Sequence, residues 1–163
     1  MTTLHEHIET TLPIDDVFDY VADFANSREW DPGVATAERL DAGPIGLGSR
    51  FRLGVRLGSR VAPMVYAISA FEPPTRVVLT GSGSGVSAVD EIRLDALATG
   101  TRLDYTADIR LGGLLRLIQP FLGGAFATIG RNAADGMRRT LEARAAAERP
   151  GGAQSAHDGR DVA

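Results

Sequence analysis

The stretch GLLRLIQPFLGGAFATIGRNAADGMRRTLEARAA, residues 113–146, predicts one long helix near the end of the chain. Its large apolar residues recur at spacings of three and four, which places them in one stripe along a helix. They are Leu114, Ile118, Phe121, Leu122, Phe126, Ile129, Met137 and Leu141. At about 1.5 Å per residue the helix would be about 50 Å long, so its apolar stripe requires a long apolar partner.

The middle of this predicted helix is weak. Pro120 lacks a backbone N–H, and Gly123, Gly124 and Gly130 each cost roughly 1 kcal/mol relative to alanine in a helix interior. We therefore expect a bend between Pro120 and Gly130, which would let the helix follow a curved partner. The alternative is that the same segment acts as a gate for a ligand.

The chain before this helix begins with a strand and two short helices. Apolar and polar residues alternate over Thr3–Leu12, with the period of two that is typical of a strand. A short helix is predicted over residues 13–23, because Pro13 suits the first turn. A second short helix is predicted at Ser27–Trp30, with Asn26 as its cap.

Six further strands are predicted from alternation and turn residues. They span residues 34–40, 51–57, 61–71, 76–82, 86–97 and 101–111. The connections between them are too short for parallel crossovers, so neighbouring strands must be antiparallel. The long helix is then expected to pack on a curved antiparallel sheet, which makes the fold class α+β.

Composition narrows the class of protein. The 163 residues are 44% hydrophobic and 23% charged, as expected for one globular domain, and the net charge of −4 argues against nucleic-acid binding. The absence of cysteine excludes disulfides, thiolate catalysis and cysteine-ligated metals. No apolar run is long enough to cross a membrane, and the first residues lack a signal-peptide pattern. We expect a cytoplasmic protein without integral membrane association.

Several short segments, taken in order, carry a family resemblance. They are PIDDVFDYVAD (13–23), WDP (30–32), GLGSRF (46–51), FEPP (71–74) and GTRLDY (100–105). With these segments the chain resembles the START-like, Bet v 1-like (SRPBCC) superfamily and, within it, the polyketide cyclase/dehydrase group. The resemblance implies a helix-grip fold over residues 1–146. In that fold a curved antiparallel sheet of about seven strands wraps around the C-terminal helix. The polar, glycine-rich residues 147–163 are predicted to be a disordered tail.

The resemblance also implies an apolar cavity between the sheet and the helix. Family members bind lipids, sterols, quinones or polyketides, and a few are cyclases. The group shares no catalytic motif, so the resemblance assigns no catalytic residue, and we expect no cofactor and no metal. It leaves open whether this chain is an enzyme.

Strand alternation and the helix stripe predict which residues would line such a cavity. The candidates are Trp30, Phe51, Leu53, Tyr66, Asp90, Tyr105, Ile118, Leu122 and Phe126. The alternative is a solid core filled by the same residues, because an apolar lining and an apolar core have the same composition. Within the set, the hydroxyls of Tyr66 and Tyr105 could orient a ligand.

Asp90 is the one candidate for catalysis. Alternation places it on the face of Ala88, Ile92 and Leu94, which we take as the inner face. A carboxyl group facing an apolar cavity would have a raised pKa and could act as a general acid or base. The alternative is that a bulge at Asp90-Glu91 turns this carboxylate towards solvent.

Two surface patterns are not expected to form functional sites. His5, His7 and Glu9 share one strand face, but ligands at this spacing on one extended strand do not converge on a single ion. Arg50, Arg52, Arg56 and Arg60 form a basic stripe on one strand, which we expect to be solvated and paired with Asp104 and Asp108.

Three functions are compatible with the sequence. The first is a carrier that binds a small hydrophobic molecule, such as a polyketide, an aromatic compound, a quinone or a lipid. The second is a cyclase/dehydrase-type enzyme, in which Asp90 and a tyrosine move protons around an enolisable ketone. The third is a regulatory protein that acts through a partner-binding surface. A homodimer is left open.

Overall fold

The alternating segments form a single antiparallel sheet in the computed structural model, which describes residues 2–57, 59–83, 85–113 and 123–148. The sheet has seven strands in the order β1-β7-β6-β5-β4-β3-β2. The strands are β1 (Thr2–Thr10), β2 (Val34–Arg39), β3 (Arg50–Leu57), β4 (Arg60–Glu72), β5 (Arg76–Gly83), β6 (Val86–Leu97) and β7 (Gly100–Leu111). Strands two to seven pair in chain order, as their short connections predict, and β1 completes the sheet beside β7.

The helices follow the predicted order with small differences. They are α1 (Ile14–Ala22), η1 (Phe24–Asn26), α2 (Ser27–Trp30) and α3 (Gly123–Glu148). Asn26 occupies the predicted N-cap position of the second helix, but its side chain makes no capping hydrogen bond. Its side-chain amide instead donates a hydrogen bond to the Tyr20 carbonyl oxygen (2.9 Å). Asn26 is itself the end of the 3₁₀ turn η1, so its side chain faces back along the chain.

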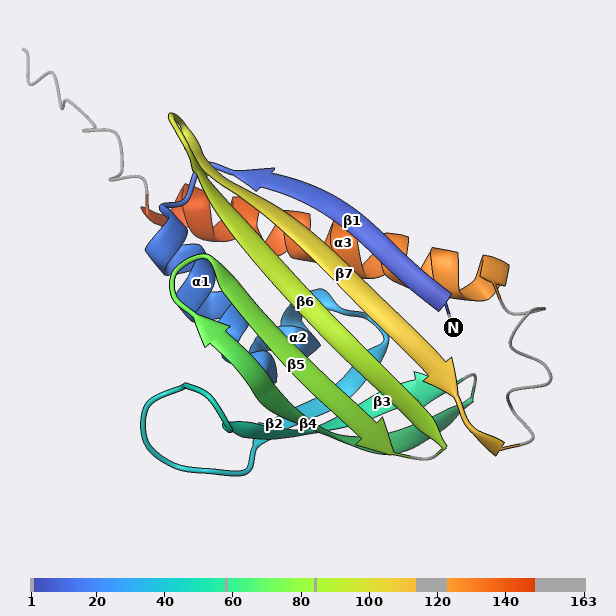
Figure 1. Cartoon of the computed structure of the whole chain (residues 1–163). Helices are drawn as coiled ribbons and strands as arrows, with labels where there is room; N and C mark the ends of the chain where they lie inside the picture. Colours follow the sequence, from blue (N-terminus) through green and yellow to red (C-terminus); the bar gives the residue numbers. More distant parts are fainter. Residues whose placement is uncertain (1, 58, 84, 114–122, 149–163) are drawn as a thin grey trace, which may run out of the picture.

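The sheet is curled, and Figure 1 shows all helices on its concave side, with α3 running alongside β1. Helix α3 packs chiefly on β1 and α2. Gly113 has φ +57°, which lies outside the right-handed helical region, so the helix does not begin there as predicted. Residues 114–122, including Pro120, lie outside the described residues. The helix continues two residues past the predicted end at residue 146, and residues 149–163 are also outside the described part.

Small residues decide which face of α3 is buried. Its buried residues beyond position 126 are Gly130, Ala133, Ala134, Gly136, Met137, Leu141 and Ala145. Ile129, which the spacing of large apolar residues places in the buried stripe, is instead 41% exposed. At the contact between α3 and α2 the two helices approach closely: a Cβ atom at Gly136 would lie 1.9 Å from the carbonyl oxygen of Trp30. This contact leaves no room for a large side chain where α3 meets α2.

The inner face of the sheet forms most of the core. Its fully buried side chains include Ile8, Phe51, Leu53, Ile68, Val77, Leu79, Ile92 and Leu103. Phe18 of α1 closes one end of this core and packs against Phe71 with ring centroids 5.3 Å apart. The inner face is therefore apolar along most of its length, and its few polar residues stand out.

The arginine stripe has different partners from those expected. Arg52 pairs with Glu38 on the neighbouring strand (2.6 Å). Asp104 pairs with His7, and Asp108 accepts a hydrogen bond from Thr3. The predicted pairing is wrong because β3 and β7 are separated by three strands in the sheet. None of the described helices has the length and hydropathy needed to span a bilayer.

Candidate functional site

Asp90 is the polar residue at the centre of the inner face. It lies between the buried residues Ala88 and Ile92 on β6 and is 4% exposed. Its neighbours across the sheet are Leu79 on β5 and Ala107 on β7, both buried. The strand stays in register here, so no bulge turns the carboxylate outwards. Alternation thus predicted the direction of this side chain correctly.

Only one oxygen of Asp90 is satisfied. Tyr105 pairs with Ile92 and lies diagonally across from Asp90 on the same face, within reach of a long side chain. Its hydroxyl donates a hydrogen bond to Oδ1 of Asp90. The other oxygen, Oδ2, is buried and has no hydrogen-bond partner among the described residues. A buried polar atom without a partner is uncommon in folded proteins and is costly, and this carboxylate oxygen is one of four such side-chain atoms among the described residues.

Burial changes the acidity of this carboxyl group. Burial raises the pKa of Asp90 to about 7, helped by the negative charge of Asp31, whereas the hydrogen bond from Tyr105 lowers it. A carboxyl group with such a pKa is present in both protonated and ionised forms at neutral pH. It can therefore donate a proton to a bound group or accept a hydrogen bond from one.

An arc of aromatic rings continues from Tyr105, the residue that binds Asp90. Trp30, at the end of α2, packs edge-on against Tyr105 with ring centroids 6.0 Å apart. Phe24 of η1 packs against Trp30 at 6.2 Å and against Tyr66 at 5.1 Å. The arc thus runs from β7 through the two short helical segments to β4. It is built from residues that are far apart in the sequence.

Tyr66 reaches towards Asp90 because the residue beside it is glycine. Tyr66 pairs with Gly81 on β5, and a Cβ atom at Gly81 would lie 2.4 Å from the tyrosine ring. The missing side chain lets the ring lie across β5. Burial raises the pKa of the Tyr66 hydroxyl well above its ordinary value, and the charges of Asp90 and Asp31 add to this effect. The hydroxyl therefore stays protonated in the neutral range.

A second carboxyl group acts on the same region. Asp31 follows α2, and its Oδ1 accepts a hydrogen bond from the backbone N–H of Gly33 (2.7 Å). Burial raises the pKa of Asp31, while this hydrogen bond and the charge of Arg56 lower it. The charge of Asp31 raises the pKa values of Asp90 and of both tyrosines. The negative charge of Asp31 thus destabilises the ionised form of Asp90.

The predicted site residues fall into three groups. Trp30, Tyr66, Asp90 and Tyr105 come together, whereas Phe51 and Leu53 are fully buried beside them. Ile118 and Leu122 lie outside the described residues, as does the side chain of Phe126. Sequence reasoning missed Phe24, Asp31 and Gly81. Asp31 stands in the WDP segment, where the adjacent Pro32 and Gly33 suggested only the end of a helix.

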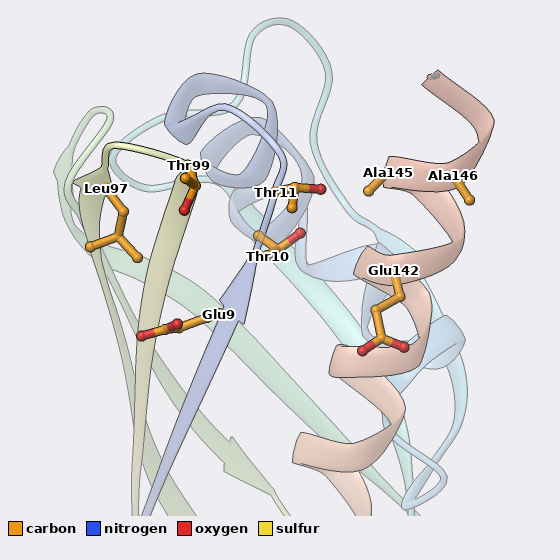
Figure 2. Close-up of a pocket in the computed structure, with 8 residues that line it drawn as sticks. All are labelled: Glu9, Thr10, Thr11, Leu97, Thr99, Glu142, Ala145 and Ala146. Atoms are coloured by element: carbon orange, nitrogen blue, oxygen red, sulfur yellow. The ribbon is translucent and has the colours of Figure 1, made fainter. Parts of the chain in front are cut away.

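A surface pocket lies apart from this cluster. Its volume is about 430 Å³. Figure 2 shows that its lining residues come from the end of β1, the β6–β7 turn and the last turns of α3. Its lining residues are Glu9, Thr10, Thr11, Leu97, Thr99, Glu142, Ala145 and Ala146. Glu9 extends over β7, away from Glu142, so the two carboxylates do not converge (Figure 2). None of the predicted site residues whose side chains the structure describes lines this pocket, and we assign the candidate site to the Asp90 cluster.

The histidines of β1 are engaged with the neighbouring strand. His5 Nδ1 lies 3.0 Å from Thr106 Oγ1, and His7 Nδ1 lies 2.9 Å from Asp104 Oδ1. The hydrogen bond to Asp104 raises the pKa of His7. In the part of the chain that the structure describes, no three His, Asp or Glu side chains are grouped so that they could hold a metal ion.

The chain was compared with protein families and with curated proteins. Residues 1–142 match the family model described as "Polyketide cyclase / dehydrase and lipid transport". No curated protein matches the chain.

Three solved structures illustrate the shared fold. One is a Thermus thermophilus protein at 12% identity and TM-score 0.71, covering 85% of this chain and 96% of its own. A START superfamily protein from Mycobacterium smegmatis has 15% identity, TM-score 0.69 and coverages of 90% and 99%. The Zhui aromatase/cyclase from a Streptomyces species has 16% identity, TM-score 0.61 and coverages of 85% and 94%. At these identities the likeness establishes the fold alone.

Proposed function

Because the chain belongs to the polyketide cyclase/dehydrase and lipid transport family, we propose that it binds one small, largely apolar molecule against the inner face of the sheet. The molecule's polar group meets the carboxyl group of Asp90. The observation that carries this proposal is the buried Oδ2 atom of Asp90, which has no hydrogen-bond partner among the described residues and belongs to the carboxyl group that Tyr105 joins to the aromatic arc.

The energetics favour a ligand at this position. An unsatisfied buried polar atom costs about 1–3 kcal/mol, and a ligand group that pairs with Oδ2 would recover that cost on binding. The aromatic rings around it offer apolar area and defined ring orientations to a flat or hydrophobic skeleton. Such an arrangement combines general hydrophobic attraction with one oriented polar contact.

The chain contains its own probe for this binding. Trp30 is the single tryptophan, and it lies in the aromatic arc beside Tyr105. We therefore expect its fluorescence to change saturably when the protein is titrated with α-tetralone, an aromatic ketone, or with decanoic acid. Native mass spectrometry should report one ligand per chain.

A matched pair of variants locates the binding. Ala88→Leu adds bulk on the inner face two residues from Asp90, whereas Ser87→Leu adds nearly the same bulk to the exposed outer face of the same strand. We expect the first to weaken binding roughly tenfold and the second to leave it unchanged. If neither ligand alters Trp30 emission, or if both variants bind like the parent protein, the proposed site is wrong.

A second candidate function is acid–base catalysis, favoured by the pKa of Asp90 near 7. A group with this acidity can deliver and take up a proton at neutral pH, as cyclisation or dehydration of a ketone requires. If the protein is such an enzyme, Asp90→Asn abolishes turnover of an enolisable poly-β-keto substrate analogue while binding persists. A carrier would show no turnover in either form.

A further inference from the structure

The inner face has an unbalanced charge. The carboxyl group of Asp90 lies there, and the negative charge of Asp31 raises its pKa, although the charge of Arg56 acts on Asp31 itself. The chain contains no lysine at all, so no amine side chain can neutralise either carboxylate. Among the described residues no arginine or histidine forms an ion pair with Asp90, whose only hydrogen bond comes from the neutral hydroxyl of Tyr105.

The groups around Oδ2 also suit a positive charge. The faces of tyrosine, tryptophan and phenylalanine rings carry negative charge density and attract cations, most strongly when water is excluded. Trp30 and Tyr66 are almost fully buried, and together with Phe24 and Tyr105 they form one continuous aromatic arc. A carboxylate flanked by aromatic rings is a suitable environment for an organic cation.

We propose that the ligand's polar group is a protonated amine on an apolar or aromatic skeleton, and that it donates a hydrogen bond to Oδ2 of Asp90. This inference rests on the proposed function and names the ligand class of the same site. The amine would supply the positive charge and the donor that the described residues do not provide. Tyr105 holds Oδ1, so the carboxylate presents Oδ2 to the ligand.

An amine ligand and a ketone ligand should show opposite pH dependences of affinity. An amine needs the ionised form of Asp90, whereas a ketone oxygen needs the protonated form as its donor. With a carboxyl pKa of about 7, the ionised fraction falls about tenfold between pH 8 and pH 6. An alkylamine stays protonated across this range, so its apparent affinity should fall about tenfold as the pH is lowered.

Other titratable groups face Asp90 and must be considered. Tyr105 and Tyr66 have pKa values well above their ordinary range and do not titrate between pH 6 and 8. Asp31 also has a raised pKa, so its charge would reinforce the effect of Asp90 in the same direction. Glu6 of β1, which pairs with Tyr105, also carries a titratable side chain on this face.

The experiment compares two probes with the same skeleton, 2-phenylethylamine and 2-phenylethanol. Binding of each to the full chain is measured by calorimetry and Trp30 fluorescence at pH 6 and pH 8. We expect the amine to bind at least about tenfold more tightly than the alcohol at pH 8, because a hydrogen bond between charged groups is stronger than a neutral one. This difference in affinity between the amine and the alcohol should be smaller at pH 6.

Three variants sharpen the test. Asp90→Asn keeps the shape of the side chain and should lose about tenfold or more in amine affinity while changing alcohol affinity little. Tyr105→Phe removes the hydrogen bond that lowers the pKa of Asp90, so the pH midpoint of amine binding should move upwards. Glu91→Gln removes a charge from the outer face of the same strand and should change neither probe.

Each outcome decides between the proposals. If amine and alcohol bind equally well, or if Asp90→Asn does not separate them, the amine inference is overturned while a hydrophobic site remains. The same conclusion follows if α-tetralone binds but phenylethylamine does not, and tighter tetralone binding at pH 6 would then indicate a ketone ligand. If no probe binds, the proposed function fails as well.

Discussion

Asp90 and Glu91 are adjacent in the chain, but their side chains lie on opposite faces of the sheet. Asp90 points to the inner face of β6, where burial raises its pKa to about 7. Glu91 points to the outer face, where hydrogen bonds from Arg76 and the charge of Arg93 lower its pKa. Two acidic residues separated by one peptide bond therefore have shifts of opposite sign. The difference comes entirely from the face on which each side chain lies.

The contrast extends along both faces. On the outer face, Arg76 bridges Glu72 and Glu91, and Arg102 pairs with Asp95. These partly exposed pairs each contribute little, because water competes for the same charges. On the inner face, the buried carboxyl group of Asp90, which has no charged partner among the described residues, has a large pKa shift. Buried charge without compensation is tolerated where a protein has a use for it, which is why we place the site there.

The largest expected effect comes from Asp90→Asn. The folded-state pKa of about 7 lies above the ordinary value of 3.8, so the folded protein binds this proton more tightly than the unfolded chain does. Stability from this group is therefore complete below about pH 4 and is lost as the pH rises through 7. The variant should match the parent near pH 4 and be more stable by up to about 4 kcal/mol at pH 8. Urea denaturation across this range measures the difference, and a pH-independent difference would contradict the assignment.

The next effect comes from Gly136→Ala, which disturbs the packing that holds Trp30 over the inner face. The added Cβ would lie 1.9 Å from the Trp30 carbonyl oxygen, so α2 and α3 must move apart at a cost of about 1–3 kcal/mol. Trp30 emission should shift to the red as water enters, and the pKa of Asp90 should fall towards its ordinary value. Gly130→Ala is the control, because its Cβ meets only the movable Leu4 side chain at 3.1 Å. Equal destabilisation by both variants would refute this account.

A smaller effect is expected for Tyr105→Phe. This change removes the hydrogen bond to Oδ1, which lowers the pKa of Asp90, so that pKa should rise further. The lost hydrogen bond should destabilise the protein by about 1 kcal/mol. The carboxyl carbon of Asp90 can be followed by NMR during a pH titration. A downward movement of the pKa would show that Tyr105 acts mainly by excluding water.

The smallest effect is expected for Glu91→Gln on the outer face. Its pKa is lowered in the folded state, so its contribution is present at neutral pH and is lost as the pH falls. Because its side chain is 29% exposed, the loss of its ion pairs should cost under about 1 kcal/mol at pH 7. The pH dependence should thus be opposite to that of Asp90→Asn. Matching pH profiles for the two variants would remove the contrast between the faces.

Much of the fold could be predicted, because the decisive signals are local. The alternation in β6 and β7 specified which side chains face inwards, and the short turns specified antiparallel neighbours. The buried face of α3 could not be read in the same way. Ile129 fits the helical spacing yet is exposed, because contacts with β1 and α2 favour glycine and alanine at the interface.

The candidate site was predictable only in part. Asp90 and Tyr105 follow from alternation on two paired strands, and their diagonal contact follows from the strand register. The positions of Phe24 and Asp31 relative to them do not follow, because both lie in short irregular segments whose course depends on contacts with α3 and the sheet. The role of Gly81 does not follow from the sequence either, because it depends on the Tyr66 ring lying against it.

The sequence by itself determined the order of the elements, the α+β class and the inward direction of Asp90, because side-chain alternation is a local property of an extended backbone. The tertiary structure alone decided that Oδ2 has no partner among the described residues, that Tyr105 joins Asp90 to an arc of aromatic rings, and that the charge of Asp31 acts on Asp90. Those features depend on which side chains the curled sheet and the α2–α3 contact bring together. Distance in space, unlike alternation, is not encoded in neighbouring residues.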